Sequence, residues 1–273
     1  MTRLNLESLE RRAGQIPSEL SVQADEYRYG SKGLDRAWIL LAMASGHLTL
    51  GVYELLVRKD VLRFKQQFYV ASALLLMRYR RHDAQDMDTG TIVTYSILSD
   101  CHKLTREVAL LEPRSHVELR QKPREINFLI YMDQLCILGD DRKLRELIEI
   151  GAMHSGKRYK EEFSAHRDFF SLFLARDQIS LERRIANLAL IKTAILPFEG
   201  RIALGALKEA KLCWMKGIEV QIADPMVPKV VLPVAPLAQY DPIYDFLAPD
   251  WKPPLRGRIG TLFGSIKGRL DSN

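Results

Sequence analysis

The sequence predicts a mainly α-helical protein, either an antiparallel helical bundle or a degenerate stack of helical hairpins. Through most of the chain up to Gly217, apolar residues recur every three or four positions, which is the spacing of a helix with one buried face. The connections between these segments are short, and short connections favour antiparallel neighbours. Eight of the twelve prolines follow Ala223, so the helical pattern cannot continue beyond that residue.

The helical segments follow one another in order along the chain. The first begins at Leu4 and is expected to end near Gly14, with Pro17 as its stop signal. The clearest amphipathic helix starts after an N-cap at Asp60. Further helical spacings occupy residues 38–56, 92–98, 104–111, 126–136, 144–148, 163–173, 181–188 and 203–214.

Polar or flexible residues mark the breaks in this pattern. Ser99 and Asp100 are predicted to separate two short helices and to cap the second one. Gly217 is predicted to end the last helix, because glycine readily adopts the left-handed conformation of a helix cap. Apolar and polar residues then alternate over 218–222, which is the pattern of one short strand.

These boundaries divide the chain into three parts. Residues 1–217 are predicted to form an all-helical domain, residues 218–250 the short strand and a proline-rich extended segment packed on the same domain, and residues 251–273 a basic tail. We call residues 225–247 the arm. We expect it to lie across the helices, because its prolines reduce the entropy lost on ordering and its apolar side chains can be buried. The arm residues expected to be buried are Val227, Val230, Leu232, Tyr244 and Phe246.

The basic tail carries an apolar stripe at helical spacing. Ile259, Leu262 and Phe263 belong to this stripe, and Arg258 and Lys267 flank it. Such a segment is typical of a helix that docks on the protein itself or of one that binds a membrane surface or a partner. We expect docking or fraying, because so short a helix is marginal alone.

Charge and composition favour a cytoplasmic protein. The formal charge of +6 is scattered and does not gather on one face, so nucleic acid is not a favoured partner. The chain has no run of eighteen apolar residues and its first twenty residues are charged throughout, so neither a membrane span nor a secretory signal peptide is expected. The three cysteines are far apart, which is typical of reduced thiols. The oligomeric state stays open.

No motif for catalysis or for metal binding stands out. The nearest metal-like grouping, His154 and His166 with Glu161 and Glu162, lacks a standard ligand spacing. The His-Arg-Asp tripeptide at 166–168 matches a kinase catalytic loop only by chance, since the rest of that signature is missing. We therefore nominate no catalytic residue, no metal and no cofactor, and expect that the protein is not an enzyme.

Residues 211–247 resemble the C-terminal signature of a known family. A helix ends in Trp-x-x-Gly, a Glu-Val-x-Ile run follows, and a Pro-x-x-Pro-Lys segment leads to a Tyr-x-x-x-Tyr-x-Phe-Leu ending. Upstream, Ile97-Leu98-Ser99-Asp100 is similar to a Leu-Leu-Ser-Asp element, although Cys101-His102 stands where an Asn is usual. The family is immunity protein family forty-nine of bacterial polymorphic toxin systems. The signature positions followed below are Ser99, Asp100, Trp214, Gly217, Glu219, Pro225, Pro228 and Phe246.

The resemblance implies a mostly helical cytoplasmic protein that protects its producer by binding a partner toxin. Neutralisation is then stoichiometric occlusion, without catalysis and without a cofactor. Two alternatives stay open, a helical enzyme with an unrecognised site and a nucleic-acid-associated helical protein. The candidate partner-binding residues are aromatic and acidic, and the same aromatic residues are also candidates for staples that hold the arm on the protein. These candidates are Tyr240, Asp241, Tyr244, Asp245 and Trp251.

Overall fold

The computed structural model describes residues 3–30, 34–82, 89–191, 197–252 and 254, so the predicted tail helix lies outside the described residues. More than half of the chain is in α-helices, which confirms the prediction of a mainly α-helical protein. The α-helices are α1 (Arg3–Tyr29), α2 (Arg36–Tyr53), α3 (Val61–His82), α4 (Thr89–Leu98), α5 (His102–Ala109), α6 (Arg114–Leu119), α7 (Ile126–Leu138), α8 (Asp141–His154), α9 (Lys157–Ser164), α10 (Phe169–Ala175), α11 (Gln178–Ala189) and α12 (Leu204–Met215). The shorter elements are a π-helical turn η1 (Glu54–Arg58) and the 3-10 turns η2 (Lys229–Val231) and η3 (Asp245–Leu247).

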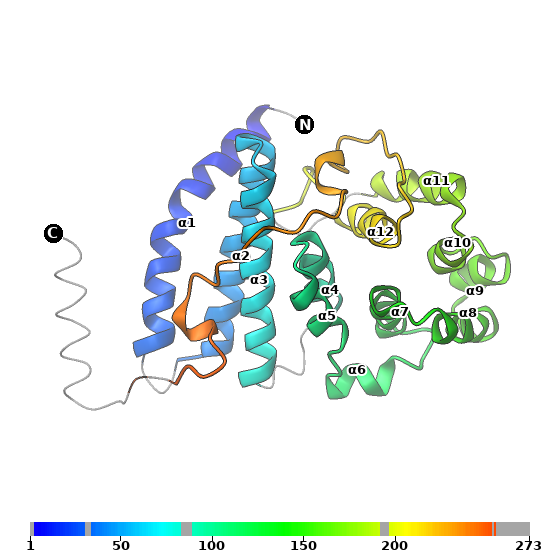
Figure 1. Ribbon diagram of the computed structural model, residues 1–273, viewed down its shortest axis with the longest axis horizontal. Helices are drawn as coiled ribbons and strands as arrows, with labels where there is room; N and C mark the ends of the chain where they lie inside the picture. The colour runs from blue at the N-terminus through cyan, green and yellow to red at the C-terminus, as the bar shows by residue number, and fades with distance from the viewer. Residues whose placement is uncertain (1–2, 31–33, 83–88, 192–196, 253, 255–273) are drawn as a thin grey trace.

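The helices form two groups (Figure 1). The long helices α1, α2 and α3 are antiparallel neighbours, with α2 between the other two. The shorter helices α4 to α12 lie beyond α3 as a curved succession, in which α4 contacts α3 and α12 contacts both α4 and α11. One continuous core of buried apolar side chains runs through both groups.

Helix α1 continues past Pro17, so the predicted end of the first helix near Gly14 is wrong. A proline inside a helix removes a backbone hydrogen bond and costs about 3 kcal/mol. Apolar side chains on both sides of Pro17 offset this cost, because Ile16 and Leu20 are buried in the core and α1 packs along α2. The buried stripe of α1 therefore outweighs the local stop signal.

Helix α2 lies in the middle of the three-helix layer. By length and composition alone, the helical stretch Arg36–Arg58 is long and apolar enough to cross a membrane, and it is the one such stretch among the described residues. The core helix of a soluble protein passes the same test, and 61% of the most apolar window of this stretch is buried inside the protein. The stretch is therefore weak evidence for a membrane span.

The predicted strand at 218–222 is not formed, and the described ranges contain no β-strand. Ile218, Val220 and Ile222 are buried while Glu219 and Gln221 are exposed, so the alternation correctly indicated which side chains face the core. A strand also needs the backbone of a neighbouring strand. Here side chains of α11 and α12 donate hydrogen bonds to the carbonyls of the segment instead.

The arm contains η2 and η3 and crosses the helical body from α12 toward α1 (Figure 1). Four of the five arm residues expected to be buried are buried. Val230 is instead 61% exposed, because the η2 turn directs the neighbouring Val231 into the core. The four buried residues are Val227, Leu232, Tyr244 and Phe246.

We expect Gly51→Ala to destabilise the protein by about 1–3 kcal/mol, because the added methyl group overpacks the contact between α2 and α3. A Cβ at Gly51 would lie 2.9 Å from two ring atoms of Phe68, whose side chain is fully buried. Gly14→Ala in α1 is the control: a Cβ there meets no atom within 4 Å, so the change should stabilise the helix by about 0.5–1 kcal/mol. Urea unfolding measures both variants, and effects of the same sign would contradict the close α2–α3 contact.

Candidate functional site

Three charged side chains meet in the core beneath the arm. Asp100, in the turn between α4 and α5, lies between Lys65 of α3 and Lys211 of α12. The Lys65 Nζ atom is 2.8 Å from Asp100 Oδ2, and the Lys211 Nζ atom is 2.7 Å from Asp100 Oδ1. We call these three residues the lysine–aspartate clamp. All three side chains are almost fully buried, so each charge needs its partners, because an unpaired buried ion is costly.

The two ammonium groups of the clamp also bind the arm. Lys211 Nζ donates to three consecutive carbonyls at residues 231–233, over 2.8, 3.1 and 3.1 Å, and Lys65 Nζ donates to the Ala235 carbonyl over 2.8 Å. Because the hydrogens of Lys211 are directed at these carbonyls, its contact with Asp100 is a close ion pair rather than an aligned hydrogen bond. Burial lowers the pKa of Lys211 to about 8, against the opposing effect of Asp100. The side chain is therefore still charged at neutral pH.

The turn that carries Asp100 is a break between helices, as predicted, but its predicted capping role is wrong. Cys101 occupies the N-cap position of α5, and no side chain caps that helix end. Asp100 has a φ of 59°, a left-handed conformation that Asp and Asn adopt more readily than most residues. Its carboxylate points into the clamp and also accepts a hydrogen bond from the Ala235 N–H over 3.3 Å.

The signature positions near the end of α12 connect that helix to the arm. The Trp214 indole Nε1–H donates to the Val220 carbonyl over 3.2 Å. Gly217 has a φ of 72° just after α12, which is the left-handed conformation predicted for it. Pro225 lies in a turn, and Pro228 immediately precedes η2. These four signature positions determine where the arm begins.

The remaining signature positions, which lie before, on and beneath the arm, also make contacts within the protein. The Ser99 carbonyl accepts a hydrogen bond from the Tyr240 hydroxyl over 2.8 Å, and the Glu219 carbonyl accepts one from an α11 side chain. Phe246 is fully buried and stacks on Tyr244, with ring centroids 5.0 Å apart. The signature residues thus contact other residues of the same chain, and these contacts stabilise the fold.

Both tyrosines predicted to bind a partner contact the helical body. The Tyr240 ring packs on Tyr69 with centroids 4.9 Å apart. The Tyr244 hydroxyl lies 2.8 Å from His47 Nε2, while His47 Nδ1 lies 2.5 Å from Gln67 Oε1. Because the amide oxygen only accepts, Nδ1 carries the hydrogen and Nε2 accepts from Tyr244. Burial lowers the pKa of His47 to about 4 and raises that of Tyr244 to about 12, so both groups are neutral at pH 7.

The predicted residues at the end of the arm also contact the body. Asp245 Oδ1 is 2.8 Å from an Arg28 guanidinium nitrogen. Trp251 is half-buried against Phe246, with ring centroids 6.0 Å apart, and the Arg81 guanidinium lies 5.3 Å from its ring centroid. Such contacts hold the end of the arm on the helical body, which is the role of a staple. A role of the same residues in binding a partner stays a prediction.

Asp241, the remaining predicted residue, belongs to an exposed turn at residues 241–243, which we call the tip. The Tyr244 N–H donates to the Pro242 carbonyl over 2.6 Å and closes a three-residue turn centred on Ile243. Ile243 has a φ of 63°, which is strained for a β-branched residue, and it is 49% exposed. Strain of this kind costs about 1–3 kcal/mol and gathers at functional sites.

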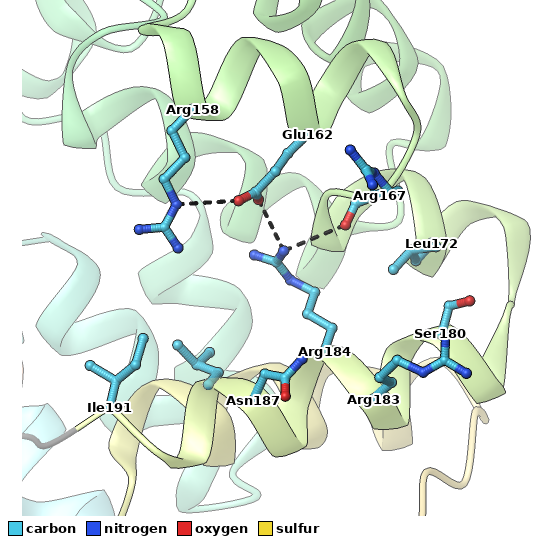
Figure 2. Close-up of a pocket in the computed structure, with 10 residues that line it drawn as sticks. Arg158, Glu162, Arg167, Leu172, Ser180, Arg183, Arg184, Asn187 and Ile191 are labelled. Atoms are coloured by element: carbon cyan, nitrogen blue, oxygen red, sulfur yellow. Dashed lines mark hydrogen bonds and ion pairs between the residues drawn. The ribbon is translucent and has the colours of Figure 1, made fainter.

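A second candidate site is a groove of about 520 Å³ between α9 and α11 (Figure 2). Arg158 and Glu162 come from α9, Arg167 from the turn before α10, and Arg183 and Arg184 from α11. We call it the arginine groove. Its other lining residues are Leu172, Ser180, Asn187, Leu188 and Ile191.

Acidic residues fix one arginine in this groove. The Glu162 carboxylate lies between Arg158 and Arg184, at 3.4 and 3.1 Å. Arg184 also contacts the buried Glu209 of α12 at 3.3 Å and donates to the Arg167 carbonyl over 3.5 Å. Burial alone would lower the pKa of Arg184, but the charges of Glu209 and Glu162 outweigh burial and raise it. The guanidinium is therefore charged and oriented in advance of any ligand.

The arginine groove was not predicted from the sequence. In the sequence, the charged residues of the groove have the pattern of solvent-exposed faces on separate helices. No local pattern indicates that α9 and α11 face each other in the folded protein. The kinase-like tripeptide at 166–168 has a local role, because Asp168 is the N-cap of α10 and accepts from the Ser171 N–H over 2.9 Å. Among the described residues, no group of three His, Cys, Asp or Glu side chains is placed to hold a metal ion.

No protein-family model, no curated protein and no solved structure matches this chain. The family resemblance therefore rests on the signature residues themselves.

We expect Asp100→Asn to destabilise the protein by about 3–5 kcal/mol, because it leaves two buried ammonium groups without a counter-ion. Asparagine tolerates the left-handed φ of this residue, so backbone strain adds little. Asp241→Asn, a change at an exposed aspartate of the tip, is the matched control and should alter stability by less than about 0.5 kcal/mol. Urea unfolding measures both. If Asp100→Asn lowered the free energy of unfolding as little as the control does, the clamp would not hold the arm.

We expect His47 to make the protein sensitive to acid. The folded-state pKa of about 4 lies below the ordinary value of 6.5, so between these values only the unfolded chain takes up the proton. Stability is therefore lost as the pH falls from about 6.5 to about 4, by roughly 3 kcal/mol in total. His47→Gln cannot titrate, so its stability should fall less over this range than that of the wild type. Parallel pH profiles for the two proteins would contradict a buried neutral His47.

Proposed function

We propose that this protein is an immunity protein, which neutralises a bacterial toxin effector by binding it stoichiometrically and occluding it. The resemblance of residues 211–247 and of Ser99-Asp100 to immunity protein family forty-nine supports the proposal. The observation that carries it is the tip of the arm, where Ile243 is strained, apolar and exposed between two tyrosine staples.

The tip is prepared for binding by the contacts on either side of it. Tyr240 and Tyr244 hold the chain on the helical body, so little conformational entropy is lost when a partner contacts Ile243. Asp241 is exposed beside it and adds a charge, with its carboxylate accepting from the Ile243 N–H over 2.8 Å. An apolar contact bordered by a charge is a common composition for the centre of a small interface. We therefore assign partner contact first to Asp241 and Ile243.

The contacts of the other candidate residues indicate which of them hold the arm on the protein and which can contact the partner. Tyr240, Tyr244 and Trp251 use most of their contact surface within the protein, so in this proposal they act mainly as staples. Asp245 is paired with Arg28 but remains exposed, so it stays a candidate contact. The proposal thus keeps the predicted partner-binding region and moves its centre to the tip.

A titration distinguishes a stoichiometric inhibitor from an enzyme. The purified protein is added to the protein encoded by the neighbouring gene, the candidate toxin, while the activity of that toxin is measured. We expect inhibition to saturate near one equivalent, because occlusion removes one toxin molecule per complex. Complete protection at a small fraction of an equivalent would instead require turnover, and the protein would then be an enzyme.

Ile243→Gly separates partner contact from stapling. Glycine adopts a φ of 63° without strain, so the variant should be as stable as the wild type or more stable by up to about 1 kcal/mol. It should nevertheless bind the toxin roughly thirty-fold more weakly, which corresponds to a hot spot of about 2 kcal/mol. Ile126→Ala in α7, where the side chain is also exposed, is the control and should leave the affinity unchanged. Calorimetric titration measures the affinity of each variant for the toxin, and urea unfolding measures its stability.

Two outcomes of these experiments have different meanings. If the wild type binds the toxin and Ile243→Gly binds it equally well, the tip is not part of the interface. If the wild type neither binds nor inhibits the toxin, the proposed function itself is contradicted.

A further inference from the structure

The side chains that line the arginine groove carry more positive than negative charge. Four guanidinium groups line it, while Glu162 is the one carboxylate among its lining residues. Arg167 and Arg183 are exposed and form no side-chain ion pair within the described part of the chain. Like charges held close together raise the local positive potential, so an anionic ligand gains free energy by entering the groove.

The contacts of Glu162 indicate which anion the groove fits. Its carboxylate lies between Arg158 and Arg184, and the dashed contacts in Figure 2 show it facing both helices that form the walls. Guanidinium groups are planar forks that match carboxylates in geometry. A carboxylate from another molecule would meet Arg167 and Arg183 at the same groove, since neither side chain forms an ion pair with an acid in the described part of the chain.

Exposed aliphatic side chains occur on α11, which forms one wall of the groove, and just after its end. Ile179 near the start of α11 is 72% exposed, and Leu190 and Ile191 just after its end are 75% and 56% exposed. Ile191 also lines the groove itself. Arginine beside exposed aliphatic surface is the composition of a protein interface, in which charge gives orientation and apolar contact gives affinity.

The same features disfavour nucleic acid as the occupant. The lining residues of the groove include no aromatic side chain, so bases have no ring on which to stack. The Glu162 carboxylate, which lies between Arg158 and Arg184, would repel a run of phosphates, whereas an acidic peptide can place an aliphatic side chain beside it.

We propose that the arginine groove binds an acidic segment of a partner protein. Its carboxylates contact Arg158, Arg167 and Arg183, and its aliphatic side chains pack on Ile191. The groove lies beyond α3 from the arm tip, so it is a second interaction surface (Figure 1). The binding chemistry is the same whether the partner is the toxin or another protein.

A short fluorescent peptide of alternating Glu and Leu tests the proposal directly, with fluorescence anisotropy as the measurement. We expect the full-length protein to bind this peptide, and to bind it more weakly as salt is added, because part of the attraction is between exposed charges. A peptide with Lys in place of Glu should not bind. A double-stranded oligonucleotide and inorganic phosphate are the other two probes, and tighter binding of either than of the acidic peptide would overturn the assignment to a protein segment.

Charge reversal locates the binding on the protein. Arg158→Glu should weaken peptide binding at least roughly ten-fold, because an attraction becomes a repulsion. Arg114→Glu is a close control: Arg114 and Arg158 are both 82% exposed, and each pairs through Nε with a glutamate four residues later. The control should change the affinity less than about two-fold, because its charge is remote from the groove.

Arg183→Gln is a milder variant that breaks no ion pair within the described residues, so it keeps the test valid if Arg158→Glu unfolds the protein. It should weaken peptide binding about three-fold or more, as expected for loss of one exposed charge contact. If Arg183→Gln and Arg158→Glu fold and bind the peptide like the Arg114→Glu control, the proposal is wrong. Ile243→Gly should bind the peptide normally, so failure of the groove and failure of the arm tip are distinguishable.

Discussion

The position of the arm depends on one buried carboxylate, that of Asp100. Its two partners, Lys65 and Lys211, come from α3 and α12, so three segments that are distant in the sequence must meet for any of the charges to be buried. Two ammonium groups exceed one carboxylate in charge, and the arm carbonyls at 231–233 and at Ala235 complete their hydrogen bonding. Because an incomplete buried network is costly, the arm and the helices it crosses stabilise each other.

The contacts beyond the clamp determine which part of the arm is presented outward. Once the carbonyls are fixed, Tyr240 reaches Ser99 and Tyr244 reaches His47, and the short connection between the two tyrosines contains the strained turn at Ile243. The free energy that holds Ile243 in its unfavourable conformation comes from these staples and from the hydrogen bond that the Ile243 N–H donates to the Asp241 carboxylate. A fixed, exposed tip on a firmly attached arm is the physical basis of the proposed partner contact.

Positive charge exceeds negative charge in both the clamp and the arginine groove, but the excess is buried in the clamp and accessible in the groove. In the clamp, the excess is buried and is satisfied by carbonyl oxygens of the same chain, so it stabilises the fold. In the groove, Glu162 and Glu209 orient Arg184, while Arg167 and Arg183 remain open to solvent and have no internal ion pair in the described residues. Of these two sites, the groove is the one whose excess charge is accessible, which is why we propose it as the site for an acidic partner.

The sequence by itself determined the helical class, the break at Ser99-Asp100, the end of α12 just before Gly217 and which side chains of 218–222 point inward, because periodicity and backbone preference are local properties. It placed the end of α1 near Gly14, with Pro17 as the stop signal, and it predicted a strand; both predictions failed because the packing of α1 on α2 and the lack of a partner strand are not local. Only the tertiary structure brought Asp100 between two lysines and Arg158 opposite Arg184. The physical reason is that the free energy of a charge depends on its neighbours in space, which residue spacing does not specify.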